Sequence, residues 1–515
     1  MKKILTIAFF SLAAASAFAQ DMYDGLRFGD VNYYGSARTM GMGNAVTAVG
    51  GDIGTVGINP AGSAVASYSQ FSITPAVTSS ATTADYSPIS GTDDFTSSYK
   101  ESHTSFNLPQ TGALFNYATG NKSGLKSFSL GVLVNTTANY RDRMTISGNN
   151  DYTSMCGALA VATEGCNYEA LDLNKNAYAY AQYAWPSVLA YNSRLIEDYE
   201  DDLYVGTTEN IDQNDNIALG GRIRQGMSRN HYGTKEDIVF NAGFNFNDNL
   251  FLGVNVGVPV LDFTESICYT ETSESPADFQ TQFDNMRYRY NYTAEATGIY
   301  AKLGVIWLPA TGLRLGATFQ TPTIMTVNEV WDADAFAVCG DSQYSGEDYV
   351  DGEAYSYHLT TPLRFSVGAA YTFSNMLLVS ADFERCDFRN MKFREFANDY
   401  NSYFEDVNKE IQDYAGATNE LRIGVEFKPY ENVAARCGYN LKSYVCPDYT
   451  DKTSSFSLGA GYYSNGSFFT DFAFRMTKYP QSWYYPYDDY CDVRSTEVRL
   501  NKNFFDILLT FGWRF

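Results

Sequence analysis

Apolar and polar residues alternate along most of the chain, from about residue 66 to the C-terminus. In residues 421–428, one face carries only apolar side chains, which are Leu421, Ile423, Val425 and Phe427. The opposite face of this segment is polar or small. A period of two residues is typical of a β-strand with one apolar face. The pattern therefore predicts an all-β chain, and by itself it fits a soluble sandwich as well as a membrane barrel.

About fourteen segments show this alternation, and the links between them alternate in length. The predicted strand centres lie near residues 72, 112, 134, 240, 257, 300, 317, 364, 382, 423, 438, 458, 472 and 508. Short links such as 247–249 and 374–375 contrast with long polar links, which span 80–103, 148–230, 331–354 and 394–416. An up-and-down transmembrane barrel has short turns on one rim and long loops on the other. We therefore expect an antiparallel transmembrane β-barrel of about 14 strands over residues 66–515, with 148–230 as its largest extracellular loop.

The final segment, "FFDILLTFGWRF", has one wholly apolar face. That face consists of Phe505, Ile507, Leu509, Phe511, Trp513 and Phe515. It suits contact with outer-membrane lipid, with aromatic residues near its ends for the interfacial girdles. An aromatic residue at the close of the last strand also resembles the terminal signal by which outer-membrane barrels are recognised for insertion. We expect Phe511, Trp513 and Phe515 to present this signal to the barrel assembly machinery.

Residues 1–19 have the features of a secretory signal peptide. Lys2 and Lys3 precede an apolar run, and the segment closes on small residues at 17–19. This run is shorter than the ~20 residues that a spanning helix needs, and no later run approaches that length. We expect cleavage before Gln20, export to the outer membrane and no helical membrane span.

Composition excludes several classes of function. A formal net charge of -23 argues against nucleic acid as a partner, because a phosphate backbone needs a basic surface. The eight cysteines are scattered singly, so neither a metal site nor another cofactor is expected. Disulfides between Cys156 and Cys166, or between Cys446 and Cys491, stay open as alternatives. The three histidines lie near predicted strand ends or loops without a nucleophile at a catalytic spacing, so the chain is not expected to be an enzyme.

Residues 35–62, "GSARTMGMGNAVTAVGGDIGTVGINPAG", contain eight glycines and only two charged side chains. Glycine disfavours the interiors of helices and strands, and flexible linkers are normally more polar than this segment. Such a segment should not fold alone. It makes sense inside a larger structure, where glycine lets one backbone approach another closely.

This glycine-rich segment resembles the N-terminal hatch of the FadL/TodX family of outer-membrane transporters for fatty acids and other hydrophobic compounds. The resemblance recurs in "TPLRFSVGAAYTF", "VSADFERCDFRNMKF", "LRIGVEFKPYENVAARCGYN" and "SFSLGAGYYSNGSFFTDFAF". It implies a fourteen-stranded barrel whose lumen is plugged by a hatch, here residues 20–65. It further implies a passive channel for long-chain fatty acids or other hydrophobic small molecules. The residues expected in hatch gating are Asn59, Pro60 and Ala61, which match the family's Asn-Pro-Ala motif, together with Gly41 and Gly43.

The loop at 148–230 carries an aromatic run, "YAYAQYAWPSVLAYNSRLI", that is unusual for an exposed loop. One interpretation is a foothold for a hydrophobic ligand on Tyr183, Trp185 and Leu189. In that interpretation Arg194, or Arg222 and Arg224, would meet a carboxylate head group. The other is that these aromatic residues fold the loop onto the barrel rim and that the arginines pair with nearby acids. The main alternative function is a non-transporting barrel that serves a secretion system or adhesion. A monomer is expected in either case.

Overall fold

The computed structural model describes residues 21–88, 95–199, 202–396, 404–447, 451–464, 467–488 and 495–515. Two sequence predictions lie outside these described residues: the signal peptide at 1–19 and the disulfide that involves Cys491.

The strands form one closed antiparallel barrel of 14 strands, which confirms the predicted fold class. Closure comes from β1 (Gln70–Ser87), which pairs with β2 (Ser97–Ala118) on one side and with β24 (Glu497–Arg514) on the other. Some strands of the wall consist of two consecutive segments, such as β3 (Leu125–Asn139) followed by β4 (Asp142–Asn150). Every predicted strand centre falls within an observed strand.

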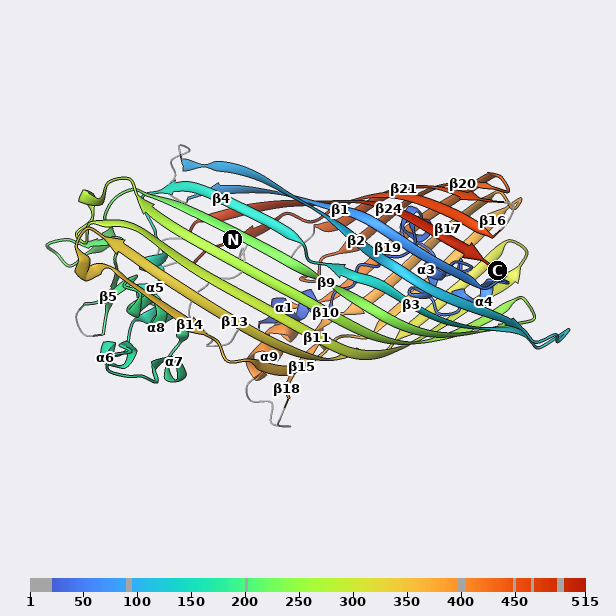
Figure 1. Ribbon diagram of the computed structural model, residues 1–515, viewed down its shortest axis with the longest axis horizontal. Helices are drawn as coiled ribbons and strands as arrows, with labels where there is room; N and C mark the ends of the chain where they lie inside the picture. Colours follow the sequence, from blue (N-terminus) through green and yellow to red (C-terminus); the bar gives the residue numbers. More distant parts are fainter. Residues whose placement is uncertain are drawn as a thin grey trace.

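The remaining wall segments follow in chain order around the barrel (Figure 1). They are β9 (Ile223–Phe246), β10 (Leu250–Ser273), β11 (Phe283–Ala310), β12 (Leu313–Gln320), β13 (Ile324–Cys339), β14 (Gly346–Asp351), β15 (Tyr355–Thr360), β16 (Arg364–Phe373), β17 (Leu377–Asp387), β18 (Lys392–Glu395), β19 (Ala417–Tyr430), β20 (Val433–Ser443), β21 (Lys452–Tyr463), β22 (Phe468–Lys478) and β23 (Ser482–Tyr484).

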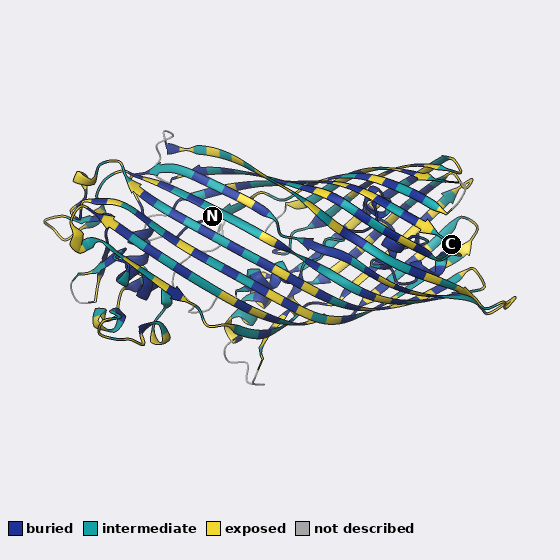
Figure 2. Cartoon of the chain, viewed as in Figure 1, coloured by how far each residue is buried: buried dark blue, intermediate teal, exposed yellow. Residues whose placement is uncertain are grey.

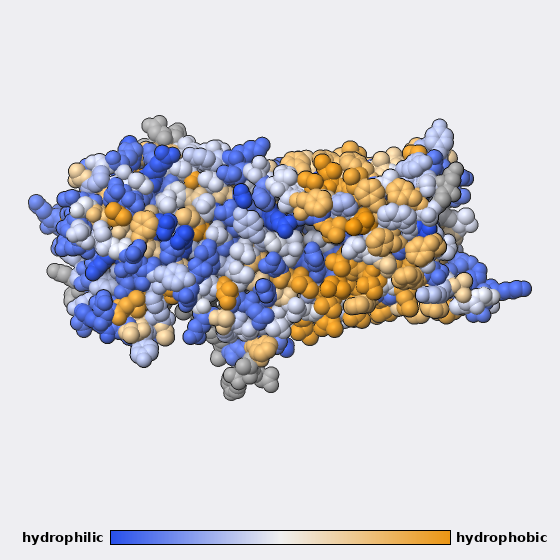
Figure 3. Space-filling view, in the orientation of Figure 1, coloured by the Kyte–Doolittle hydropathy of each residue, from blue (hydrophilic) through white to orange (hydrophobic). Residues whose placement is uncertain are grey.

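On the face that Figure 3 shows, an apolar band covers the half of the barrel that contains the C-terminus. Buried and exposed residues alternate along the strands, as Figure 2 shows. Leu303 is 52% and Ile507 46% exposed, whereas their neighbours Lys302 and Asp506 are buried in the lumen. Apolar side chains outside and charged ones inside are the reverse of a water-soluble sandwich. The outward face of this half therefore contacts lipid.

The two ends of the barrel differ, as the link lengths predict. Tight turns such as 247–249 and 374–376 lie at the end that contains the C-terminus. At the opposite end, the connection from β4 to β9 folds into an outer lobe (Figure 1). This lobe comprises α5 (Met155–Thr163), α6 (Tyr168–Leu171), α7 (Ala179–Gln182), α8 (Trp185–Asn192), β5 (Ile196–Asp198), β6 (Tyr204–Gly206), β7 (Glu209–Ile211) and β8 (Ile217–Leu219).

The strands reach further than predicted, so the predicted loop boundaries are wrong. The expected loop 148–230 shrinks to 151–222, because β4 ends at Asn150 and β9 starts at Ile223. Most residues of the links expected at 80–103 and 331–354 likewise belong to strands, which are β1 and β2 in the first link and β13 and β14 in the second. These strand ends stand beyond the apolar band, where the outward face meets water and is itself polar (Figure 3). Without lipid on one side, the alternation of apolar and polar residues fades.

Strand length makes the wall uneven in height. The strands β9, β10 and β11 have 24, 24 and 28 residues, whereas β16, β20 and β21 have 10, 11 and 12. A tilted strand crosses a bilayer with about 9–11 residues. The short strands therefore end near the outer surface of the bilayer, and the long strands continue beyond that surface as a tall wall (Figure 1). A single α-helix, α9 (Glu405–Tyr414), lies beside the short side among the described residues.

The N-terminal residues lie inside the barrel and plug its lumen (Figure 1). This plug is a chain of turns with four short helices, which are α1 (Met22–Gly29), α2 (Ala37–Gly41), α3 (Ile53–Val56) and α4 (Gly62–Val65). Side chains at the helix starts satisfy the free backbone donors: Ser36 accepts from the Thr39 N–H and Asp52 from the Gly54 N–H. Helices this short do not hold their shape alone, so the barrel wall stabilises them.

No described helix combines the length and the apolar character that crossing a bilayer requires. Cys156 and Cys166 are free thiols, so the disulfide considered between them does not form.

Deleting Phe515 should impair assembly, because its backbone N–H and C=O bond Ser69 and extend the seam that closes the barrel. Its side chain is also 68% exposed at the rim, where an insertion signal would be read. The measurement is the heat-modifiable band of the folded barrel on gels of outer membranes. Changing Asp341 to Asn, in an exposed part of the outer end, should leave that band unchanged. Equal amounts of folded barrel in the two variants would contradict the insertion signal.

Candidate ligand cavity and plug

The Asn-Pro-Ala motif joins the plug to the tall side of the wall. The amide of Asn59 donates to the Thr47 carbonyl at 2.6 Å and to the Val305 carbonyl of β11 at 3.1 Å. Its oxygen accepts from the Ala61 N–H at 3.0 Å. One fully buried side chain thus fixes two turns of the plug and one strand of the barrel. The Pro60 carbonyl accepts from the Asn241 amide at 3.0 Å.

Glycines of the wall allow this close approach. Gly253 of β10 pairs with Gly243 of β9 and with Gly304 of β11, so three glycines adjoin across the sheet. A Cβ on Gly304 would lie 2.0 Å from the Asn59 Oδ1, and one on Gly253 would lie 2.2 Å from the Pro60 carbonyl carbon. The plug backbone therefore rests directly on the wall backbone.

The same contact recurs on the short side of the barrel, at the glycines that the sequence singled out. Gly43 has a φ of 62°, and its N–H lies 2.1 Å from the position of a Cβ on Gly438. The Cα of Gly41 lies 3.2 Å from the position of a Cβ on Gly459. The structure thus brings Gly41 and Gly43 onto one wall and Asn59, Pro60 and Ala61 onto the opposite part.

Basic side chains of the wall satisfy plug carbonyls that have no partner in a helix or sheet. The Nζ of Lys235 donates to the Phe28 carbonyl at 2.7 Å. The Nζ of Lys302 donates to the Gly57 carbonyl at 2.9 Å, and the Nη2 of Arg364 donates to the Gly29 carbonyl at 2.7 Å. Lysine and arginine are donors only, so they suit a backbone with surplus acceptors. These wall side chains therefore supply hydrogen bonds to plug carbonyls that lie outside any regular helix or sheet.

A cavity of about 350 Å³ lies between the plug, α1 and the wall. Its apolar lining comprises Leu26, Tyr140, Phe263, Phe388, Leu500 and Phe504. A volume of this size and a largely apolar lining are typical of small-molecule sites. The cavity lies above the plug, toward the outer lobe, because it is bounded by α1 and by strand ends beyond the tight-turn half.

Most of the charges around this cavity are paired. Lys502 contacts Asp142 at 2.8 Å, Lys442 contacts Asp30, and Glu265 holds both Arg27 and His231. Arg229 differs, because its guanidinium forms no ion pair with a described residue and lies 4.7 Å above the Tyr484 ring. A guanidinium without an ion-pair partner in a largely apolar cavity suits one carboxylate.

The wall has a gap in its hydrogen bonding beside this cavity. Pairing between β2 and β3 runs from Ala118 only as far as Gln110, so residues 97–107 of β2 pair with β1 alone. On the facing edge, the carbonyls of Thr136 and Thr137 in β3 accept from plug backbone N–H groups instead. The ladder is therefore open on one side where β2 leaves β3.

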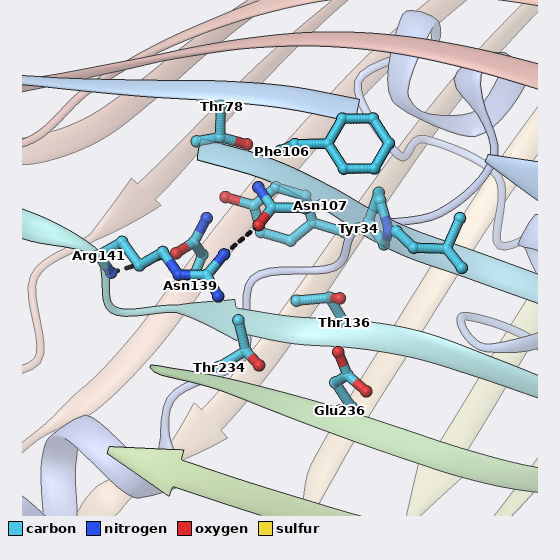
Figure 4. Close-up of a pocket in the computed structure, with 11 residues that line it drawn as sticks. Tyr34, Thr78, Phe106, Asn107, Thr136, Asn139, Arg141, Thr234 and Glu236 are labelled. Atoms are coloured by element: carbon cyan, nitrogen blue, oxygen red, sulfur yellow. Dashed lines mark hydrogen bonds between the residues drawn. The ribbon is translucent and has the colours of Figure 1, made fainter. Parts of the chain in front are cut away.

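A second cavity, of about 190 Å³, occupies this gap (Figure 4). Arg141 donates to the Asn107 side chain across it, and Tyr34 of the plug points into it (Figure 4). Phe106 on its outer edge is 72% exposed on the outward face. Tyr34 and Asn139 line both cavities, so the two adjoin. The cavity above the plug therefore adjoins a second cavity at the side of the barrel.

The aromatic run of the outer lobe lies in a packed core. The Trp185 ring stacks on Tyr290 at 5.8 Å and lies 4.6 Å from Trp331, both on the tall wall. Leu189 is fully buried, and Tyr183 packs against the same core. These contacts attach the lobe to the wall, in agreement with the interpretation that the aromatic residues fold the loop onto the barrel rim.

Arg194 lies apart from the cavity and pairs with Glu197 at 2.9 Å. Burial raises the pKa of the Glu197 carboxyl to about 7, although the Arg194 guanidinium opposes the rise. The structure therefore does not bring Arg194 together with Tyr183, Trp185 and Leu189 around one cavity.

Sequence reasoning missed Arg229, Tyr34 and the wall gap. The gap did leave a signal, because Pro75 and Pro109 come together where the register between β1 and β2 shifts. Proline cannot donate to a sheet ladder, so two prolines in adjacent strands indicate a break in pairing. Arg229 left none, since inward arginines such as Arg422 occur throughout the barrel as partners of carboxylates.

No family model matches the chain, and no curated protein matches it by sequence. Among solved structures it is similar to a FadL homologue of Pseudomonas aeruginosa, with a TM-score of 0.50 and 12% identity over 94% of this chain and 99% of the other. It is also similar to the toluene transporter TodX of Pseudomonas putida, with a TM-score of 0.47 and 12% identity over 94% and 99%. For the toluene transporter TbuX of Ralstonia pickettii, the TM-score is 0.45 and the identity 14% over 93% and 98%. The likeness to the FadL homologue is one of fold, and it confirms the FadL-type fold that the sequence resemblance implied.

Replacing Gly304 by Val should displace the plug and leave the barrel assembled, because the new side chain would overlap Asn59. The single-channel conductance in planar bilayers should rise above that of the wild type. Leu303→Val alters the lipid-facing neighbour in the same strand and should change nothing. If Gly304→Val conducts like Leu303→Val, contact with this glycine does not hold the plug.

Proposed function

We propose that this chain is an outer-membrane channel that takes up hydrophobic small molecules, with long-chain fatty acids as the substrate class. The observation that carries the proposal is the amphipathic cavity above the plug. It presents an apolar surface from several strands together with one guanidinium, Arg229, that forms no ion pair with a described carboxylate. An apolar chain and an anionic head group together would satisfy both parts of the lining.

The wall gap supports a route out of this cavity. The lumen below is filled by the plug, whose backbone contacts the wall glycines directly. The adjoining cavity at Tyr34 and Asn139 leads instead between β2 and β3, beside outward apolar residues such as Phe106 and Leu108. A hydrophobic molecule that leaves sideways enters the lipid without crossing the polar plug.

The proposal keeps the plug as the gate. Tyr34 belongs to the plug and lines both cavities, so a shift of the plug would change the width of the connection. A gate of this kind needs two plug arrangements whose populations the ligand changes.

The test is uptake in a strain that lacks other transporters of this type, with the membrane level of each variant measured in parallel. Arg229→Gln should lower the uptake of oleate about tenfold, because a charge-assisted hydrogen bond is lost. It should leave the uptake of toluene, which has no head group, within about twofold of wild type.

The matched control is Arg224→Gln, five positions earlier in the same strand. Arg224 is exposed on the outward face, where it bonds Ser147, and its loss should affect neither compound. Equal loss of oleate uptake in the two arginine variants would refute the role of Arg229. If the protein confers no uptake of either compound, the secretion or adhesion function becomes the better proposal.

Replacing Asn59 by Ala should leave the barrel assembled and alter the uptake of oleate. The change removes the bonds to Thr47 and Val305 and leaves their carbonyls without this donor. Whether uptake rises or falls depends on whether the loosened plug opens or obstructs the route past Tyr34. The readout is the initial rate of uptake per folded barrel. A wild-type rate at normal abundance would show that the motif is a packing element only.

A further inference from the structure

The base of the plug contains a cationic cavity of about 580 Å³, at the rim with the tight turns. One of its basic residues, Arg38, comes from the plug, and three come from strand ends of the wall, which are Arg314, Lys428 and Arg514. Among the residues that line it, the only carboxylate is that of Glu431, in the exposed turn after β19. Such a concentration of positive charge stands out in a chain with a formal net charge of -23.

One carboxylate behind the lining is shared by several cations. Glu426 contacts Arg38 at 3.0 Å, Arg436 at 2.7 Å and Lys428 at 3.3 Å. A single negative charge thus faces three positive ones. Only Arg436 has a second acid, Asp471 at 2.6 Å.

Two further guanidiniums at the cavity form no ion pair with a described residue. Arg314 donates to the Val49 carbonyl of the plug at 2.6 Å. Arg514 lies over the rings of Tyr68 at 4.6 Å and Phe469 at 4.8 Å, and its buried Nε has no hydrogen-bond partner. A buried guanidinium that lacks an acceptor is costly, and a bound anion would supply the acceptors.

We propose that this cavity binds a phosphate group. Guanidinium groups match the oxygens of phosphate in pairs. Three guanidiniums and one ammonium at this cavity outnumber the two carboxylates beside them, Glu426 and Glu431. The cavity lies at the depth of the membrane interface, because Trp513 and Phe515 on either side of Arg514 point outward as rim aromatics. Phosphate is available there from a phospholipid head group of the inner leaflet or from a soluble phosphate in the periplasm.

This site is distinct from the uptake cavity and needs the plug in place. Arg38 and Val49 are plug residues, whereas Arg314, Lys428 and Arg514 belong to the wall. A bound phosphate would therefore join the plug to the wall at the rim opposite the outer lobe. Its occupancy adds a fixed contact at the base of the plug that does not depend on any hydrophobic ligand.

The experiment is isothermal titration of the full-length protein in a non-ionic detergent and phosphate-free buffer. One arm uses inorganic phosphate, and the other uses dihexanoyl phosphatidylglycerol below its micelle concentration. The variants are Arg314→Gln, Arg514→Gln and Lys428→Gln, so the site is still tested if a change next to the C-terminus impairs assembly. Each variant that assembles should bind the effective probe about tenfold more weakly.

The control is Lys122→Gln, which removes an exposed cation on the same rim outside the cavity and should leave binding unchanged. Binding of inorganic phosphate identifies a soluble anion as the source, and binding of the lipid alone identifies a head group. Either result supports the site when the cavity variants weaken it. The proposal is overturned if neither probe binds the wild type, or if the cavity variants bind as well as Lys122→Gln does.

Discussion

The fold depends on how an irregular stretch of chain can fill the lumen of a closed barrel. Its backbone needs a partner for each buried polar group, and its short helices supply only some of them. Two devices of the wall solve this. Glycines such as Gly253 and Gly304 let the plug lie against the strands, and donors such as Lys302 and Arg364 bond its carbonyls. Because the plug is fixed in this way, the space for a hydrophobic ligand lies above it.

The unequal wall follows from the same arrangement. Where the plug fills the lumen, short strands that just cross the bilayer are sufficient, as on the side of β16 and β20. Above the plug, the long strands β9 to β11 carry the outer lobe and the residues that line the uptake cavity. The gap between β2 and β3 lies at the junction of these two levels, and there the plug replaces the missing strand as partner of Thr136.

Lipid is the reason that the sequence predicts the strands and not their ends. Within the apolar band, each outward position such as Leu303 meets hydrocarbon and each inward one such as Lys302 meets the plug, so the alternation is strong. Beyond the band, water replaces lipid, so the outward residues are polar and the sequence predicts loops where the strands of the tall wall continue. The plug was found from its glycines through a family resemblance. Arg229 was not found, because only the three-dimensional arrangement separates an unpaired arginine from a paired one such as Arg422.

Positive and negative side chains are also unevenly distributed in the structure, which the net charge alone does not show. A net charge of -23 argues against nucleic acid as a partner, yet the lumen around the plug is rich in lysine and arginine. The plug explains this division, because its turns leave carbonyl acceptors that only donor groups can satisfy. Each plug carbonyl that binds Lys235, Arg314 or Arg364 takes a hydrogen bond without cancelling the positive charge. Where carboxylates do not compensate these cations, positive charge remains, and this occurs at both ends of the plug: at Arg229 above it and at Arg514 below.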